Sequence, residues 1–531
     1  MNPAMAAELR RRESESVLFS RLLSFAHSAL PDPPVSAAAR LSALLLPHDD
    51  HISRLPDALL RNIVSRLPVK DAARTAALSS RWRGVWRSAP LVLADAHLLP
   101  DLIPAVTRAD ARRVPSVVSL ILAAHPGPFR CIHLTVSHLE EYQGPLARWL
   151  GLLAAKGTQE LVLANRPPPV VLRLPAAIFG IDTLTRLYLA LWKFPDIPRT
   201  AYFPNLRELG LCTVVIESRH LDSILARSPV LETLCLQGNM LMDRLTINSR
   251  SIRCVYVVAT SDLDITVEEA PQLQRLIVWV ASTCKGGSPR KTIKIGRVQA
   301  LGLIGYLEPE FHTLQVGDTT IKPSAKPSPF TMLPTVKILG LKVRFGVRNE
   351  AKMLPCFLRC FPKVERLHIE VSRPHYSNTI AAAYRLNSIS SLHGLTNNLL
   401  QSKETIESSS KINLKFWKES GTIASICSSV NLIIFHNFRG DQCELCFLKF
   451  ILESAQMLTK LVVVYRKGTF ASLAEARSKV DPLFDVSWAS KCCSLRLVQS
   501  ALAEGEGLKI LNFKRGSNFS LSDPLAFTGR C

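Results

Sequence analysis

The sequence predicts an α/β protein in which a small helical domain precedes a solenoid of repeated strands. Between residues 50 and 90, short apolar runs at helical spacing are separated by prolines. From about residue 130, a pattern of three leucine-like residues in six recurs at intervals of 21 to 25 residues. A chain of 531 residues is also too long for one hydrophobic core. Several structural units are therefore expected.

The composition is that of a folded, soluble protein. Hydrophobic residues make up 47% of the chain and charged residues 20%, so there is ample apolar surface to offset the entropy of the unfolded chain. The longest apolar stretch, Val114–Ala124, is interrupted by Pro115 and falls short of the roughly 20 residues of a membrane-spanning helix. No apolar block follows the basic run Arg10–Arg12, as a secretory signal would require.

Cysteine usage predicts a reducing compartment, and therefore the nucleus and/or the cytoplasm. The 13 cysteines are odd in number, scattered, and embedded in apolar patterns, as at Cys212 and Cys235, which is typical of free thiols. The formal charge of +22 is spread along the chain, and no zinc-finger spacing or aromatic RNA-binding signature is present. This distribution argues against nucleic-acid binding and favours an acidic or phosphorylated protein partner.

Residues 50–90 predict three short helices. Pro56 suits a first helical turn and Pro68 stops the run. A second helix is expected near Asp71, and Ser79 or Ser80 can cap a third. Apolar side chains of the first helix repeat at helical spacing at Leu59, Leu60, Ile63, Val64 and Leu67. About 40 residues cannot close a large core alone, so some of these side chains should be available to a partner, although an ordinary helical subdomain packed on its own chain has the same periodicity.

The motifs of this segment closely resemble the F-box of plant F-box proteins. They are ISRLPD at 52–57, IVSRLP at 63–68 and RTAALSSRWRGVW at 74–86. The resemblance implies a helical domain that docks on the Skp-type adaptor, and through it on a cullin, in an SCF ubiquitin ligase. The positions that it implies for adaptor binding are Leu55, Pro56, Leu59, Leu60, Ile63, Leu67, Pro68, Val69 and Leu78. Trp82 and Trp86 match positions that complete the F-box fold.

The repeated pattern has the period and spacing of leucine-rich repeats. Clear copies begin at Leu184, Leu206, Leu231, Ile252 and Leu273, with weaker ones at Val336 and Val364. No single copy can bury its apolar face, so the copies are expected to stack into a curved solenoid, or horseshoe, with a concave sheet. A set of unrelated amphipathic strands is the alternative. The basic residues 284–297 are expected to form a loop, and the polar residues 376–410 an insertion or linker.

Exposed side chains between the leucines are the candidates for binding a protein substrate, although each also fits an ordinary solvated surface residue. They are Arg186, Tyr188, Arg207, Glu208, Glu232, Arg275, Arg366 and His368. The identity of the substrate does not follow from them.

The C-terminal residues resemble the FBD region of plant F-box proteins with leucine-rich repeats. The matching motifs are FHNFRG at 435–440, ELCFLKF at 444–450, WASKCC at 488–493 and NFSLSDP at 518–524. The resemblance implies no chemistry for this region, which we expect to cap the end of the solenoid. The fold class predicted is thus α/β: a small helical F-box, a leucine-rich-repeat horseshoe and a C-terminal FBD cap.

No motif for catalysis, a cofactor or a metal is present. Phosphate loops, zinc-protease helices, nucleophile elbows and calcium loops are absent from the sequence, and Cys443 and Cys446 form a C-x-x-C pair without a second ligand pair. We therefore expect a non-catalytic receptor subunit that holds a protein substrate near an enzyme recruited elsewhere in the complex. An adaptor-bound scaffold that never delivers ubiquitin would share the F-box, and a basic nucleic-acid-binding protein is a more distant alternative.

The expected organisation has six parts. They are a mostly flexible leader at 1–49 with a short helix near 17–30, the F-box at 50–90, a linking helical segment at 91–129, the leucine-rich repeats at 130–375, the polar insertion at 376–410 and the FBD-like module at 411–531.

Overall fold

The computed structural model divides the chain into two compact units, Met1–Leu241 and Met242–Cys531, which are considered separately below. It describes residues 20, 23–35, 51–99, 108–166, 172–239, 241–258, 263–279, 290–309, 311–322, 328–372, 412–503 and 513–526. The predicted insertion at 376–410 lies outside these residues. In the ranges described, no helix combines the length and the apolar character needed to cross a membrane.

The first unit contains the three predicted helices. They are α2 (Asp57–Val64), α3 (Val69–Thr75) and α4 (Ser80–Ser88), preceded by the 3-10 helix η1 (Ile52–Arg54). Pro56 and Pro68 stand immediately before α2 and α3, where their missing N–H groups cost no hydrogen bond. The Ser79 hydroxyl caps α4 by accepting the backbone N–H of Trp82 at 3.3 Å. The three-helix prediction is confirmed, except that α3 begins two residues before Asp71.

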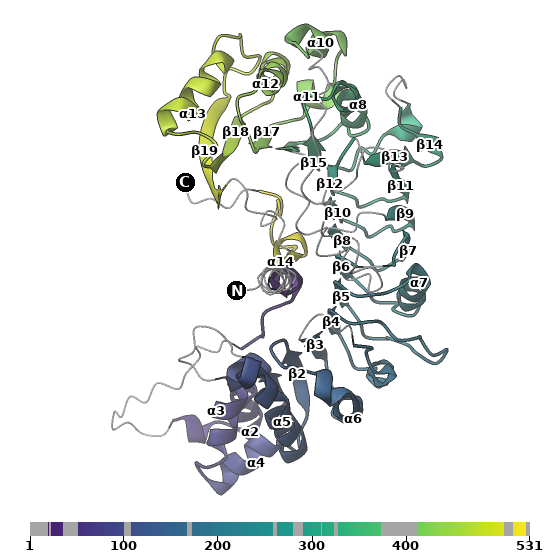
Figure 1. The fold of residues 1–531 in the computed structure, drawn as a ribbon, viewed down its shortest axis with the longest axis vertical. Helices are drawn as coiled ribbons and strands as arrows, with labels where there is room; N and C mark the ends of the chain where they lie inside the picture. The colour runs from purple at the N-terminus through teal and green to yellow at the C-terminus, as the bar shows by residue number, and fades with distance from the viewer. Residues whose placement is uncertain are drawn as a thin grey trace, which may run out of the picture. The chain divides into compact units, whose positions relative to one another are not determined.

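Among the described residues of the first unit, six parallel strands form the sheet in the order β1 to β6; β2 to β6 are labelled in Figure 1. The strands of this sheet are β1 (Leu91–Ala94), β2 (Phe129–Leu134), β3 (Glu160–Ala164), β4 (Arg186–Ala190), β5 (Glu208–Cys212) and β6 (Thr233–Gln237). In register, Leu161, Leu187 and Leu209 align across three strands and are buried. Alternate residues of a strand point to opposite faces, so this row of leucines forms the interior of the solenoid, as the repeat pattern predicts.

Helices connect these strands. They are η2 (Asp95–Leu98), α5 (Arg108–Ala124), η3 (Glu140–Tyr142), α6 (Gln143–Ala155), η4 (Ala176–Gly180) and α7 (Ser218–Ala226). The sheet begins earlier than expected, because β1 lies inside the segment 91–129 that was predicted to be a helical linker. Asp95 ties β1 to the turn after β2: its buried carboxylate accepts the backbone N–H groups of Thr135, Val136 and Ser137 at 2.8–3.0 Å.

The second unit contains two parallel layers of strands, which form neighbouring columns in Figure 1. The main layer runs through β8 (Cys254–Val258), β10 (Arg275–Trp279), β12 (Leu303–Leu307), β15 (Ile338–Val343), β16 (Arg366–Val371), β17 (Leu432–His436), β18 (Lys460–Lys467) and β19 (Ser494–Ala503). The smaller layer consists of β7 (Arg244–Asn248), β9 (Asp264–Glu269), β11 (Lys291–Arg297), β13 (His312–Val316) and the antiparallel β14 (Thr319–Thr320). Residues 291–297, predicted as part of a basic loop, are therefore a strand with Ile293 and Ile295 buried.

The C-terminal module extends the sheet with strands of its own. Strands β17, β18 and β19 continue the parallel ladder of β16, residue by residue. The FBD-like part thus extends the solenoid instead of sealing it with a different fold. Its helices, with those that precede it and the terminal ones, are η5 (Pro329–Thr331), α8 (Arg348–Arg359), α10 (Leu414–Glu419), α11 (Ala424–Ser428), α12 (Gln442–Ser454), α13 (Leu473–Val480), η6 (Asp481–Leu483) and α14 (Phe513–Gly516).

Part of the leader packs against the sheet of the first unit. Residues 23–29 are helical, as predicted, and Ala26 and Ala29 are fully buried. The side chain of Gln237 in β6 donates a hydrogen bond to the carbonyl of Phe25 at 2.5 Å. Val35 joins a buried cluster with Val92 of β1 and Cys131 of β2. The expectation of a mostly flexible leader does not hold for residues 23–35. They lie on the face of the sheet opposite the row of buried leucines, which we call the open face.

Candidate adaptor-binding and recognition surfaces

Helix α2 carries apolar side chains on two faces. Leu60 and Val64 are fully buried and form the interior of the helical domain. Leu59 and Ile63, also four residues apart, remain 51% and 38% exposed. Side chains at this spacing are neighbours on one helix face. Helix α2 therefore presents a pair of aliphatic side chains to solvent after its own domain has closed.

Further apolar side chains of the helical domain are exposed. Ile52 of η1 is 55% exposed, and Leu78, between α3 and α4, is 66% exposed. Pro56 is also exposed, while Leu55 and Leu67 are half-buried. Large apolar groups gathered on one small domain mark an interaction surface more often than isolated ones do. We call Ile52, Pro56, Leu59, Ile63 and Leu78 the apolar surface of the helical domain; Ile52 was not among the predicted contacts, although it begins the first motif.

Three of the predicted adaptor contacts lie inside the domain. Leu60 is 0% exposed, Val69 is 4% exposed and Pro68 is buried. A partner cannot reach these side chains while α2 and α3 keep their places. We therefore assign Leu60, Pro68 and Val69 to the framework of the domain and keep the exposed residues as candidate contacts.

The two tryptophans of α4 contact other parts of the first unit. Trp82 is buried, and its indole N–H donates to the Ser53 hydroxyl at 3.2 Å. Trp86 is half-buried and packs edge-on against His125, with ring centroids 5.1 Å apart. Trp82 thus ties α4 to η1, and Trp86 ties α4 to the residue after α5.

Arg81 of α4 fixes the chain that carries the exposed side chains. Its guanidinium donates to the carbonyl of Leu55 at 2.6 Å, to the carbonyl of Ser53, and to the Asp57 carboxylate at 2.7 and 2.9 Å. Charge-assisted hydrogen bonds of this kind are stronger than neutral ones. Arg81 therefore holds η1 and the first turn of α2 in one arrangement.

The helical domain is basic. Residues 52–90 contain eight lysines and arginines but only two acidic residues, Asp57 and Asp71. Both acids already pair with arginines of the same domain, Arg81 and Arg74, at 2.7 Å. The charge left on this domain is positive, which suits a partner with an acidic surface.

The open face of the first unit's sheet carries a connected polar row. Arg186 of β4 donates to both carboxylate oxygens of Glu208 at 2.8 and 3.0 Å and to Glu160 of β3 at 3.1 Å. Tyr188 lies over Gly210 so closely that a Cβ there would be 2.1 Å from its ring. Of the predicted substrate contacts, Arg186, Tyr188 and Glu208 are thus brought together, but Tyr188 is buried and is not the exposed side chain that was expected. Arg207 and Glu232, just before β5 and β6, form a separate ion pair.

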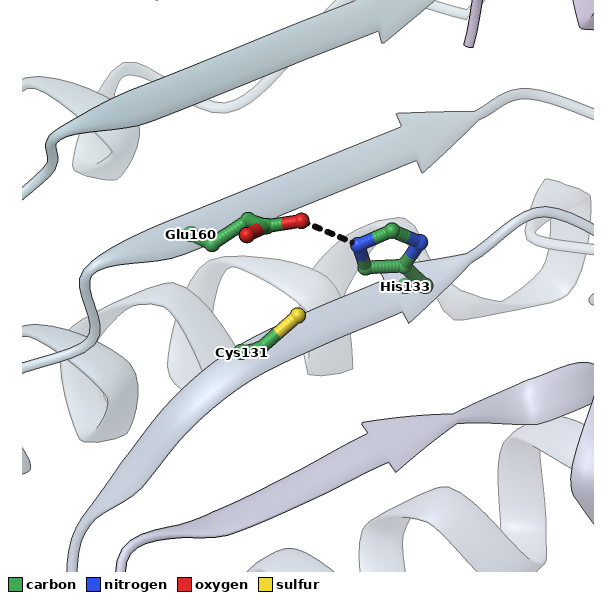
Figure 2. Close-up of side chains that lie close together, drawn as sticks. All are labelled: Cys131, His133 and Glu160. Carbon is green, nitrogen blue, oxygen red and sulfur yellow. Dashed lines mark hydrogen bonds and ion pairs between the residues drawn. The ribbon is translucent and has the colours of Figure 1, made fainter. Parts of the chain in front are cut away.

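Cys131, His133 and Glu160 form a compact cluster on this face (Figure 2). A hydrogen bond of 2.7 Å joins Nε2 of His133 to Oε1 of Glu160, and the donor atoms of all three residues lie within 4.8 Å of one another. Burial and then the charge of Glu160 raise the pKa of the Cys131 thiol well above its ordinary value. Burial acts to raise the pKa of Glu160, but the hydrogen bond from His133 and the charge of Arg186 together hold it below its ordinary value.

The chemistry of this cluster fits a divalent metal poorly. It offers three donors, one fewer than a closed zinc site needs. The Arg186 guanidinium, 3.1 Å from Glu160, already places a positive charge beside the only carboxylate. The Cys131 side chain is buried and packs with Val35 and Val92. We interpret the cluster as a hydrogen-bonded patch of the open face.

The predicted contacts of the second unit are covered by the chain's own C-terminal segment. Arg275 of β10 is only 8% exposed and donates to three backbone carbonyls of residues 516–521. His368 of β16 is fully buried against Asp523 at 3.0 Å, and Arg366 lies 3.7 Å from the same carboxylate. Sequence reasoning missed this cover, although the segment contains the quoted motif at 518–524.

Three family models match the chain. Residues 52–93 match the F-box domain, residues 146–369 match the LRR repeats of the FBD-associated F-box protein At5g56370, and residues 418–463 match the FBD.

Curated relatives come from Arabidopsis thaliana. The F-box/FBD/LRR-repeat protein At1g13570 is 27% identical over 334 residues, which is 61% of this chain and 76% of that protein. The putative FBD-associated F-box protein At5g56440 is 23% identical over 452 residues, covering 79% of this chain and 94% of that protein. The F-box/LRR-repeat protein At3g26922 is 30% identical over 199 residues, covering 36% of this chain and 62% of that protein.

Proposed function

Because the chain belongs to the F-box/FBD/LRR-repeat family of plant proteins, we propose that it is the substrate-receptor subunit of an SCF-type ubiquitin ligase. In this proposal, the F-box binds a Skp-type adaptor and, through it, a cullin. The open faces of the leucine-rich repeats bind a protein substrate. F-box proteins are typically non-catalytic, so ubiquitin is transferred by an enzyme that the rest of the complex recruits.

The observation that carries this proposal is the division of apolar side chains on α2. Leu60 and Val64 are buried inside the domain, whereas Leu59 and Ile63 stay exposed on the other face. Exposure of an aliphatic side chain to water is unfavourable, and its burial by a partner lowers the free energy of the complex. The contact residues that we propose are Ile52, Pro56, Leu59, Ile63 and Leu78, with contributions from the half-buried Leu55 and Leu67.

Proximity is what a receptor of this kind contributes. A substrate held on the repeats shares one complex with the ubiquitin-loaded enzyme, so an encounter between two molecules becomes an event within one assembly. The charged rows of the open faces, such as Arg186 with Glu208, suit a protein substrate with complementary charges. We further propose that the protein acts in the nucleus or the cytoplasm, since every cysteine that the structure describes is a free thiol.

Co-expression with a Skp-type adaptor tests the first half of the proposal. The full chain carrying Leu59→Asp and Ile63→Asp should lose co-purification with the adaptor, because two charges would be desolvated at the interface. A matched control replaces Met457 and Leu473, which are 57% and 51% exposed in the second unit, by aspartate. The control should still co-purify. Equal retention of the adaptor by both variants would contradict the proposed contact.

Substrate turnover tests the second half. In plant cells, the half-life of proteins captured by the chain should lengthen when the Leu59→Asp/Ile63→Asp variant replaces the wild type. A scaffold that binds the adaptor without delivering ubiquitin predicts unchanged half-lives. Captured proteins that are neither ubiquitylated nor stabilised would therefore reject the receptor role while leaving adaptor binding intact.

A further inference from the structure

The C-terminal segment of residues 513–526 lies against the open face of the second unit's main sheet. Phe513 of α14 packs edge-on against Tyr256 of β8, with ring centroids 5.4 Å apart. Gly516 comes so close that a Cβ there would lie 3.2 Å from atoms of both Tyr256 and Ile277. In Figure 1, α14 lies on the side of β8 and β10 away from β7 and β9. The segment thus occupies the face on which a substrate is expected.

The Arg275 guanidinium binds the backbone of this segment. Its Nη1 donates to the carbonyls of Gly516 and Asn518 at 2.7 and 3.0 Å, and its Nη2 donates to the carbonyl of Leu521 at 2.7 Å. Carbonyl oxygens are present in every peptide. These hydrogen bonds therefore depend on the conformation of the bound backbone and not on its side chains. The guanidinium supplies up to five donors in a fixed plane, which suits a turning segment with several carbonyls on one side.

Phe519 supplies an aromatic contact. The guanidinium carbons of Arg253 and Arg275 lie 4.0 and 4.8 Å from the centre of its ring. A cation over an aromatic face is attracted by the ring's quadrupole. This position therefore selects an aromatic side chain over an aliphatic one.

Asp523 supplies a carboxylate, four residues after the aromatic ring. Its Oδ2 lies 3.0 Å from Nε2 of His368 and 3.7 Å from Arg366, and the residue is 7% exposed. Arg366 also donates to the hydroxyl of Ser522 at 3.3 Å. A buried carboxylate needs such partners, so this end of the face selects an acidic group.

The segment is attached in a way that permits release. Within the ranges that the structure describes, the backbone-to-backbone hydrogen bonds of residues 515–526 close local turns of the segment itself. Asn518, Ser520 and Ser522 are exposed to solvent. A segment that is not part of the strand ladder can open separately from the strands that it covers.

We propose that residues 513–526 are an internal, displaceable ligand of this face, and that substrates compete with them through a turning peptide segment that carries an aromatic residue and, four residues later, a carboxylate. This inference deepens the proposed receptor function and rests on it. These residues, called the tail below, cover the face until a substrate that makes the same contacts with higher affinity displaces them.

Two polar atoms beside the Asp523 contact give a substrate something that the tail lacks. The hydroxyl of Tyr306 and the Oε2 oxygen of Glu370 are buried, and neither has a hydrogen-bond partner among the described residues. Burial, followed by the charges of Glu370 and Asp523, raises the pKa of Tyr306 well above its ordinary value. A substrate peptide that places polar groups against these two atoms would bind more tightly than residues 513–526.

Peptide binding to the full chain tests the proposal. The probe is a fluorescent peptide with the sequence of residues 513–526. On the wild-type chain it must compete with a tail whose effective concentration is on the order of millimolar. On a Phe519→Ala/Asp523→Asn variant, which weakens the tail in place, we expect at least tenfold tighter binding of the wild-type peptide. A peptide with the same two substitutions serves as the control and should not bind.

Equal affinity of the wild-type peptide for the wild-type chain and for the Phe519→Ala/Asp523→Asn variant, or no binding to either, would overturn the proposal. Hydrogen exchange on the unaltered chain decides it if the variant does not fold: amides of residues 513–526 should exchange at least a hundredfold faster than those of β8 and β10, whereas exchange together with the strands would mark the tail as fixed structure. Adaptor binding is measured on the same wild-type protein. If the adaptor binds and the peptide does not, only this inference fails; if the peptide binds and the adaptor does not, the proposed receptor function fails.

Discussion

Replacing Leu59 by alanine measures directly what the exposed face of α2 contributes. Full burial of a leucine side chain contributes about 1.5–3 kcal/mol, and Leu59 is 51% exposed. Covering that half by a partner therefore contributes about 0.8–1.5 kcal/mol. Alanine keeps only the first carbon of the side chain, so the binding free energy should fall by about 1 kcal/mol. Because 1.4 kcal/mol corresponds to a factor of ten, the Kd for a Skp-type adaptor should rise roughly fivefold.

The combined variant enlarges the effect beyond experimental error. Ile63 and Leu78 are 38% and 66% exposed, so adding Ile63→Ala and Leu78→Ala should bring the total loss to about 3 kcal/mol if the three sites contribute independently. The Kd should then rise roughly hundredfold. Titration calorimetry with the purified full chain and adaptor gives this value directly.

A matched control separates the interface from folding. Leu473 of α13 has the same exposed fraction as Leu59, 51%, but lies in the second unit. Leu473→Ala should leave the Kd unchanged, and each single substitution should alter the free energy of unfolding by no more than about 0.5 kcal/mol. A triple variant that binds within twofold of the wild type, or a Leu473→Ala variant that weakens binding equally, would refute the reasoning.

Three further predictions concern the buried carboxylate of Asp95, the raised pKa of Glu444 and the positive charge of the F-box. Asp95→Ala leaves the half-buried amides of Thr135 and Val136 and the buried amide of Ser137 without their acceptor. The free energy of unfolding should fall by on the order of 3 kcal/mol, and by less for Asp95→Asn; equal, small losses in a denaturant titration would contradict this. Burial raises the pKa of Glu444 to about 7 from an ordinary value of 4.5, so its stabilising effect is complete below pH 4.5 and is lost as the pH rises through 7. Glu444→Gln should remove that loss, on the order of 3 kcal/mol, and parallel stability curves for both proteins between pH 4.5 and 8 would count against it. Finally, raising the salt concentration from about 50 to 500 mM should slow adaptor association at least tenfold with little effect on dissociation, since the F-box is basic; a salt-independent association rate in stopped-flow measurements would argue against this electrostatic account.

The local signals in the sequence were sufficient for the helices of the F-box and for most strands of the main sheet. Pro56, Pro68 and Ser79 act on the residues next to them, and the structure begins its helices where they stand. The repeated leucines predict strands because burial follows the same period, as at Leu187 and Leu189. Signals that act within a few residues can be read without the rest of the chain.

Features that depend on distant residues could not be read in this way. Leu59 and Leu60 are both apolar and adjacent, and only the packing of α2 against α4 decides that Leu60 turns inward. Strand β1 has four residues and no repeat pattern, so only its pairing with β2 marks it as the start of the sheet. The cover formed by residues 513–526 joins positions more than 150 residues apart, as in the contact between His368 and Asp523.

Hydrogen exchange of the purified full chain, with and without a Skp-type adaptor, tests the central claim most directly. The account predicts that the adaptor slows exchange in η1, α2 and the residues around Leu78, while the strands of both units exchange as before. Protection of the repeat strands without any change between residues 52 and 80, or no protection at saturating adaptor, would contradict the assignment of the F-box helices as the docking surface.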